Sequence, residues 1–225
     1  MNYFLVKHLV LKDWYLNRRM MVASLVTSAL TFVAIAAAGA SNISIIFGII
    51  VLATILIGMG AVIMSTIVME RKQQTLPFVM SLPISYSEYI TSKVLGSLLL
   101  FLVLWTAMLA GTILTILNAP GFSHGLVPFV IIMMLEILVS TCLITTVAVT
   151  TESQGWTIGV TQVGGLALNA VGYYVAHIAS IRAGMSDHAI HWSKSATILV
   201  LAEFAIISLM LGTTFFIQSR KRDFV

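Results

Sequence analysis

Residues 126–150 read LVPFVIIMMLEILVSTCLITTVAVT, a run in which Glu136 is the one charged side chain. A helix needs ~20 mainly apolar residues to cross the hydrocarbon core of a bilayer, and this run is long enough. Five more stretches of the same kind occur, and they are residues 20–40, 43–69, 93–118, 155–181 and 195–217. The sequence therefore predicts an all-α, polytopic membrane protein with six transmembrane helices.

The composition of the 225-residue chain agrees, because 59% of its residues are hydrophobic, 9% are charged, and the mean hydropathy is +1.04. Soluble domains are nearer 45–50% apolar and ~25% charged. So few charges exclude a water-soluble globule, and so much apolar surface excludes a disordered chain. The single cysteine, Cys142, excludes a disulfide scaffold. The net charge of +4 does not indicate nucleic-acid binding, since no soluble basic face is available.

The basic residues predict the topology. Ten of the twelve lie in three clusters, and these are Lys7, Lys12, Arg18 and Arg19, then Arg71, Lys72 and Lys93, then Arg220, Lys221 and Arg222. Cytoplasmic segments carry an excess of Lys and Arg, and an even number of crossings places both termini on one side. We therefore expect a multi-pass protein of the cell (plasma or inner) membrane with both termini and the loop 70–93 in the cytoplasm.

Three regions follow from this topology. Residues 1–19 predict an amphipathic helix at the cytoplasmic face, with apolar residues at helical spacing and Lys7, Lys12 and Arg19 on the other side. A membrane-surface anchor and a contact helix for a cytoplasmic partner are both open. Residues 20–218 form the six-helix transmembrane domain, and residues 219–225 form a basic cytoplasmic tail.

The loop 70–93 reads ERKQQTLPFVMSLPISYSEYITSK. Thr75 is suited to cap a short helix that Pro83 ends, and Ser85 with Glu88 forms a capping box for the next helix. The short helix presents five apolar side chains to the cytoplasm, and these are Leu76, Phe78, Val79, Met80 and Leu82. Burying one such side chain is worth ~1.5–3 kcal/mol, so they must dock on something. The bilayer, the N-terminal helix and a groove on a cytoplasmic partner are all open.

The same loop resembles that of type-2 permeases of ATP-binding-cassette (ABC) exporters. The resemblance rests on Glu70-Arg71-Lys72, Thr75-Leu76, Ser81-Leu82-Pro83-Ile84-Ser85, Glu88 and Lys93, and the six spans, N-terminal helix and basic C-terminus are similar too. Gln74 departs from the pattern, since the family usually has Gly there. The resemblance implies that residues 76–82 are a coupling helix seated in a cleft of a separate ATPase subunit. The residues it assigns to this contact are Glu70, Thr75, Leu76, Phe78, Val79, Met80, Leu82, Pro83, Ser85 and Glu88.

The chain contains no G-x-x-x-x-G-K-[ST] motif, so it is not expected to hold ATP phosphates or to be an enzyme. The resemblance implies two partner ATPase subunits that carry ATP and Mg²⁺, a second permease chain, identical or related, and no cofactor on this chain. Drugs, peptides, lipids and glycans are all open as substrates, and the short outer loops favour an amphipathic drug or peptide over a long polysaccharide. A non-transporting membrane assembly factor or anchor is the rival interpretation, and an intramembrane enzyme is the third.

Two acidic residues, Glu136 and Glu203, fall deep inside predicted spans. A charge at the bilayer centre costs ~2.5–3.5 kcal/mol on insertion scales, so each should face protein or a wet cavity. Two roles are open for these acids. They line a translocation path, or they cross-link helices as hydrogen-bond donors. His188 and His191 share an outer loop with Asp187, but the pattern is too weak to indicate a metal site, and none is expected.

Overall fold

The computed structural model describes residues 3–41, 48, 58, 60, 62–63, 86–151 and 153–220, and within these ranges every regular element is helical. The all-α prediction is confirmed for this part of the chain. The elements are α1 (Tyr3–Ala38), α5 (Tyr86–Asn118), the short 3₁₀ turn η2 (His124–Leu126), α6 (Val127–Thr151), α7 (Gln154–His177), α8 (Ala179–Met185) and α9 (Lys194–Arg220).

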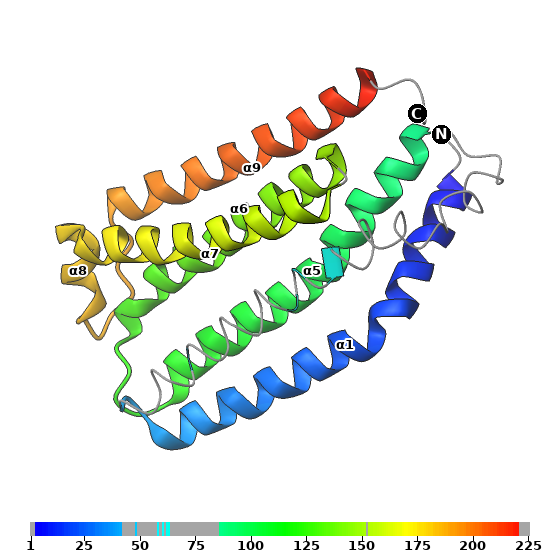
Figure 1. The fold of residues 1–225 in the computed structure, drawn as a ribbon. Helices are drawn as coiled ribbons and strands as arrows, with labels where there is room; N and C mark the ends of the chain where they lie inside the picture. The colour runs from blue at the N-terminus through cyan, green and yellow to red at the C-terminus, as the bar shows by residue number, and fades with distance from the viewer. Residues whose placement is uncertain are drawn as a thin grey trace.

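The long helices lie side by side in a bundle (Figure 1). Helix α1 packs along α5, α5 packs on α6, and α6 also contacts α7 and α9. Helices α1, α5 and α7 run in one direction, and α6 and α9 run in the other (Figure 1). The start of α1 and the end of α9 therefore lie at the same end of the bundle. We call this end the charged end, because it holds Lys7, Lys12, Arg18, Arg19 and Lys93, and we call the opposite one the loop end.

Four of the described helical segments are long and apolar enough to cross a membrane, and they are Val6–Ala38, Glu88–Asn118, His124–Thr151 and Lys194–Ile217. They correspond to the predicted first, third, fourth and sixth spans. The predicted second span, 43–69, lies outside the described residues except at positions 48, 58, 60, 62 and 63. Helix α7, at 24 residues, has the length of a span but is not among the four. The multi-pass architecture is thus established, and the count of six stays a prediction.

The N-terminal segment predicted as a separate helix is helical from Tyr3, and it continues without interruption into the first span as α1. The helix bends within its first half (Figure 1). Its buried stripe contains Val6, Leu9 and Asp13, whereas Phe4 and Leu16 are 69% and 67% exposed. One face of this segment therefore packs on the protein, and a second apolar face is open to the surroundings. Its position in the membrane plane stays a prediction.

The helix predicted over 155–181 ends earlier than expected. Helix α7 stops at His177, Ile178 is extended with φ −66° and ψ 117°, and α8 follows as a separate short helix. The reason is burial, because Ile181 packs into a cluster with Ile132 of α6, Val175 of α7 and Ala196 of α9. Helix α8 thereby covers the loop end of the bundle.

Two turns that contain glycine, one after α1 and one after α5, contact each other at the loop end. Gly39 (φ +60°) follows α1, Gly121 (φ +84°) follows α5, and the Ala40 N–H donates to the Pro120 carbonyl at 3.2 Å. A Cβ at Gly39 would lie 3.0 Å from the Pro120 oxygen, so a residue without a side chain is required there. The ends of α1 and α5 are therefore held together directly.

Candidate functional site

Most of the predicted ATPase contact lies outside the described residues. This applies to Glu70, Thr75, Leu76, Phe78, Val79, Met80, Leu82, Pro83 and Ser85. Glu88 is described, lies in the first turn of α5 and is buried. The helix that follows the loop, α5, is described, and its contacts show to which other helix the loop is connected.

A buried ion pair links α5 to α1 near the charged end. The Lys93 Nζ donates to both carboxylate oxygens of Asp13, at 3.1 Å to Oδ1 and 3.0 Å to Oδ2. The two side chains are 2% and 1% exposed. Lys93 lies two helical turns after the start of α5, so the pair connects the N-terminal helix to the segment that leaves the loop 70–93.

Small and polar neighbours fit α1 against α5 around this pair. A Cβ at Gly96 would lie 3.4 Å from Asp13 Oδ2, which is ordinary van der Waals contact, so the carboxylate lies directly against this turn of α5. The Asn17 amide donates to the Asp13 carbonyl at 2.9 Å, and the Lys93 Nζ lies 5.9 Å from the centroid of the Tyr89 ring. Lys12 approaches Asp13 Oδ1 to 3.7 Å but is 39% exposed. Lys93 is therefore the buried counter-ion and Lys12 a peripheral one.

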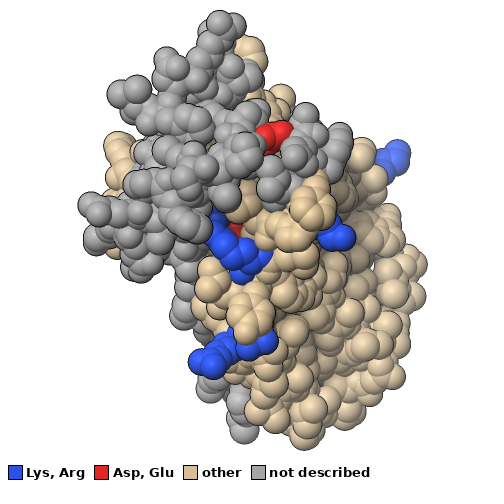
Figure 2. Space-filling model, turned by 90° about the vertical axis from the view of Figure 1, so that its right-hand side faces the viewer, with Lys and Arg blue, Asp and Glu red and all other residues tan. Residues whose placement is uncertain are grey.

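The surroundings of this pair are basic. On α1, Lys7, Arg18 and Arg19 are exposed and Lys12 is partly buried. Figure 2 looks onto the charged end, where Lys and Arg side chains emerge at several places from a surface that is otherwise mostly neither acidic nor basic. These basic side chains at the charged end are suited to contact with anionic lipid headgroups or an acidic protein surface.

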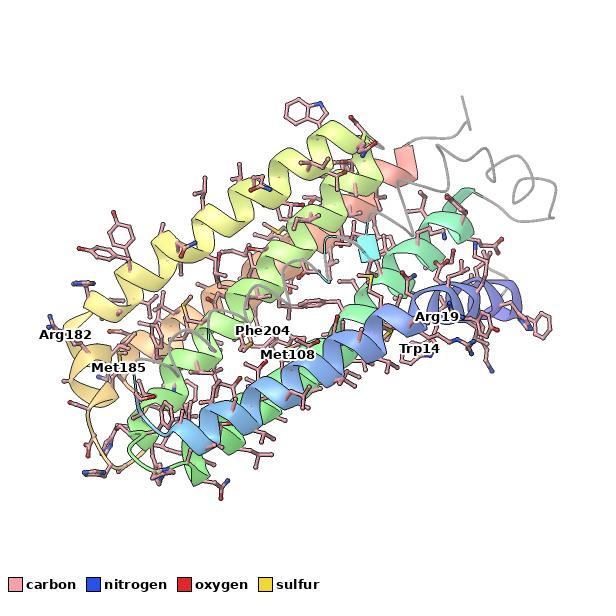
Figure 3. The ribbon with its side chains drawn as sticks, turned by 60° about the horizontal axis from the view of Figure 1, so that its bottom comes forward. Trp14, Arg19, Met108, Arg182, Met185 and Phe204 are labelled. Carbon is pink, nitrogen blue, oxygen red and sulfur yellow. The ribbon has the colours of Figure 1, made fainter. Side chains whose placement is uncertain are left out.

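Glu136 and Glu203 lie at the same level in the interface between α6 and α9. The hydroxyls of Thr146 on α6 and Thr214 on α9 are 2.8 Å apart and fix the register of the two helices. Because both helices run in the same direction, stepping back 10 residues on α6 and 11 on α9 reaches Glu136 and Glu203, about 15 Å and 16.5 Å away along the axes. Phe204, which follows Glu203, lies about midway between Arg182 at the loop end and Arg19 near the charged end (Figure 3).

The two carboxyl groups differ in environment. Glu203 is 6% exposed, and its Oε2 has no hydrogen-bond partner among the described residues. Glu136 is partly buried. The sequence contains no Lys or Arg between Lys93 and Arg182 or between Lys194 and Arg220. Neither α6, α7 nor the transmembrane part of α9 therefore supplies a basic side chain for these acids.

An apolar cavity of about 300 Å³ lies toward the loop end from the two acids. Its lining residues are Phe32, Ile35, Gly48, Thr112, Phe129, Val130, Met133 and Met134. The α6 members precede Glu136 by two to seven residues, or about 3–10 Å along the axis. The Trp105 indole donates to the Met134 carbonyl at 2.7 Å, which ties α5 to this stretch of α6.

In the loop that contains the histidines, His191 Nε2 lies 3.1 Å from Asp187 Oδ2. In the ranges that the structure describes, no group of three or more His, Cys, Asp or Glu residues is placed to hold a metal ion.

Sequence reasoning missed Asp13 and Trp105. A signal for the first was present: Asp13 is the only acidic residue before Glu70, and Lys93 is the only basic residue between Lys72 and Arg182. Two isolated opposite charges at the ends of apolar helices are natural partners, because each would otherwise be buried alone. Trp105 had no comparable signal, since its partner is a backbone carbonyl.

The comparison with known families matches a model described as "ABC-2 family transporter protein" over residues 8–219. The chain belongs to the ABC-2 transporter family. The match extends from α1 to α9 and includes the loop 70–93, which confirms the resemblance to type-2 ABC permeases. This ABC-2 protein is a multi-pass membrane component of a transport system, and its family implies association with an ABC ATPase. No curated protein and no solved structure matches the chain.

Proposed function

We propose that this ABC-2 permease is the transmembrane subunit of an ATP-driven exporter and is coupled to a separate ATPase through the loop 70–93. Residues 76–82 form the coupling helix, and Glu70, Thr75, Pro83, Ser85 and Glu88 position it. ATP and Mg²⁺ bind to the ATPase, and this chain supplies the path.

The observation that carries the proposal is the buried Asp13–Lys93 pair. Lys93 follows the coupling loop, and its partner Asp13 lies on the helix that begins the chain. Removing one partner of a buried ion pair typically costs 3–5 kcal/mol, so α1 and α5 resist separation at this point. A displacement applied to the start of α5 is therefore transmitted to α1 rather than absorbed between the two helices.

Transport follows from this connection. Closure of two ATPase subunits around ATP pushes the coupling helices, α5 and α1 move together, and α6 follows through its contact with α5. In a dimer with a second permease chain, identical or related, this motion switches the path between inward-open and outward-open states. The charged end and both termini lie in the cytoplasm, and the protein resides in the plasma or inner membrane.

The test is affinity purification of the tagged permease in mild detergent. We expect a P-loop ATPase to co-purify in a 1:1 ratio with permease chains. Asp substitution at Leu76, Phe78 or Val79 should abolish the association, because it places a charge in an apolar contact, while leaving the permease in the membrane.

A matched control is Lys7→Gln, which changes an exposed residue on α1 outside the proposed contact. If no ATPase co-purifies, and the Asp substitutions leave function intact, the chain is better described as a membrane assembly factor or anchor. An amphipathic drug or peptide is the proposed substrate, to be tested by export from cells with and without the permease.

A further inference from the structure

Glu203 has a feature that helix packing does not explain. Its side chain is more than nine-tenths buried, and one carboxyl oxygen has no hydrogen-bond partner among the described residues. A buried polar atom without a partner costs about 1–3 kcal/mol, and more when the group is charged. A carboxyl that served only to cross-link α6 and α9 would use this oxygen.

A second carboxyl at the same level increases that cost. Glu136 and Glu203 lie at the same level on adjacent parallel helices, near the middle of the bundle. Two negative charges in an apolar interface disfavour one another, and neither α6 nor the transmembrane part of α9 carries a basic residue. A positively charged group between the carboxylates would relieve both the repulsion and the missing hydrogen bond.

The apolar cavity lies beside α6, one to two turns from Glu136 toward the loop end. Phe129 lines the cavity and also packs in the cluster that holds Leu199 and Val200, about one turn before Glu203 on α9. Met133 lines it three residues before Glu136. The apolar volume and Glu136 therefore follow one another along α6, and Phe129 connects the cavity wall to the α9 residues that precede Glu203.

We propose that Glu136 and Glu203 bind the cationic group of an amphipathic molecule whose apolar part occupies this cavity. The inference rests on the proposed function, since it names the substrate class of the same permease. A volume of about 300 Å³ is within the lower range of small-molecule pockets and suits a few rings or a short alkyl chain.

The test uses the intact permease–ATPase complex in lipid nanodiscs. The probe is tetraphenylphosphonium, which is apolar and permanently cationic, and triphenylphosphine oxide serves as an uncharged probe of similar shape. Binding is measured by equilibrium dialysis. We expect Glu203→Gln and Glu136→Gln each to weaken tetraphenylphosphonium binding at least tenfold and to leave the uncharged probe unaffected.

Two controls make the result specific. Asp187→Asn removes a carboxylate from an exposed outer loop and should leave binding unchanged. Glu203→Asp retains the charge and should keep binding within a few-fold of the original, so a loss from misfolding alone is distinguishable. Size-exclusion profiles of every variant show whether the complex remains assembled.

Equal binding of tetraphenylphosphonium to the original protein and to Glu203→Gln would overturn the inference. So would a loss of binding that is the same for Glu203→Asp and Glu203→Gln in assembled complexes. Either result, with the ATPase still co-purifying, leaves the proposed function standing. Absence of the ATPase would refute the proposed function, while binding to the permease alone would still decide whether the cation site exists.

Discussion

Removing one member of the Asp13–Lys93 pair is the sharpest perturbation that the structure offers. Asp13→Asn keeps the shape of the side chain and deletes its charge, so the Lys93 ammonium, which is 2% exposed, loses the carboxylate that α1 supplies. We expect the permease to become less stable, and the coupling of ATP hydrolysis to substrate to weaken, because α1 is no longer held to α5 by charge.

The magnitude follows from geometry. At 3.0 Å and an effective dielectric constant of ~20, the attraction between the two charges is about 5.5 kcal/mol. Desolvation offsets much of this when both charges are present, so the intact pair has a small net value. When one partner is removed the desolvation cost of the other remains, and the expected loss is about 3–5 kcal/mol. For a chain of this size, that corresponds to a fall in melting temperature of about 6–20 °C.

The assay is thermal denaturation of the detergent-solubilised permease, followed by size-exclusion chromatography. Lys12→Gln is the matched control, because it removes a positive charge 3.7 Å from the same carboxylate but at a site that is 39% exposed. Its expected cost is below about 1 kcal/mol. The double variant Asp13→Asn, Lys93→Met removes both buried charges and should recover at least half of the loss. If Asp13→Asn lowers the melting temperature no more than Lys12→Gln does, the pair does not hold α1 to α5.

Three further predictions concern helix packing. Trp105→Phe deletes the hydrogen bond to the Met134 carbonyl and should reduce stability by about 1 kcal/mol, or lower the melting temperature by about 2–4 °C. An unchanged melting temperature would mean that this bond does not tie α5 to α6. Gly111→Ala would place a Cβ 2.5 Å from the Phe32 ring and should reduce stability by about 1–3 kcal/mol. The double variant that also carries Phe32→Leu should recover the lost stability, and a lack of recovery would locate the clash elsewhere. Gly125→Ala would drive a Cβ into the Gly184 carbonyl oxygen and should abolish folding of the loop end, measured as loss of the monodisperse size-exclusion peak. Gly159→Ala is the control, because a Cβ there would have nothing within 4 Å, and it should be neutral or stabilising.

Much of the fold could be predicted because apolar length alone decides which segments can enter a bilayer. The predicted spans at 93–118, 126–150 and 195–217 match α5, α6 and α9, and the first span lies within α1. The end of the fifth could not be predicted, because 155–181 contains no proline to stop a helix. Its break at Ile178 depends on the burial of Ile181 against α6 and α9, which is a tertiary effect.

The candidate site divides in the same way. The sequence identified Glu136 and Glu203 as acids in apolar surroundings, since charge inside a span is visible without coordinates. It did not show that the two acids lie on contacting helices, which follows from the Thr146–Thr214 contact and the parallel course of α6 and α9. Nor did it bring Asp13 to Lys93, which lie 80 residues apart.

The sequence by itself determined that this protein lies in a membrane, which residues form most of its helices, and to which family it belongs. The first two properties depend on transfer of local segments into lipid, which acts within about 25 residues of chain, and the family is shown by a match over residues 8–219. Only the tertiary structure decided which helices touch and which isolated charges meet. That choice depends on side-chain fit between helix faces, such as the Asp13 carboxylate that lies against Gly96 and bonds to Lys93 on α5, and no local pattern encodes it.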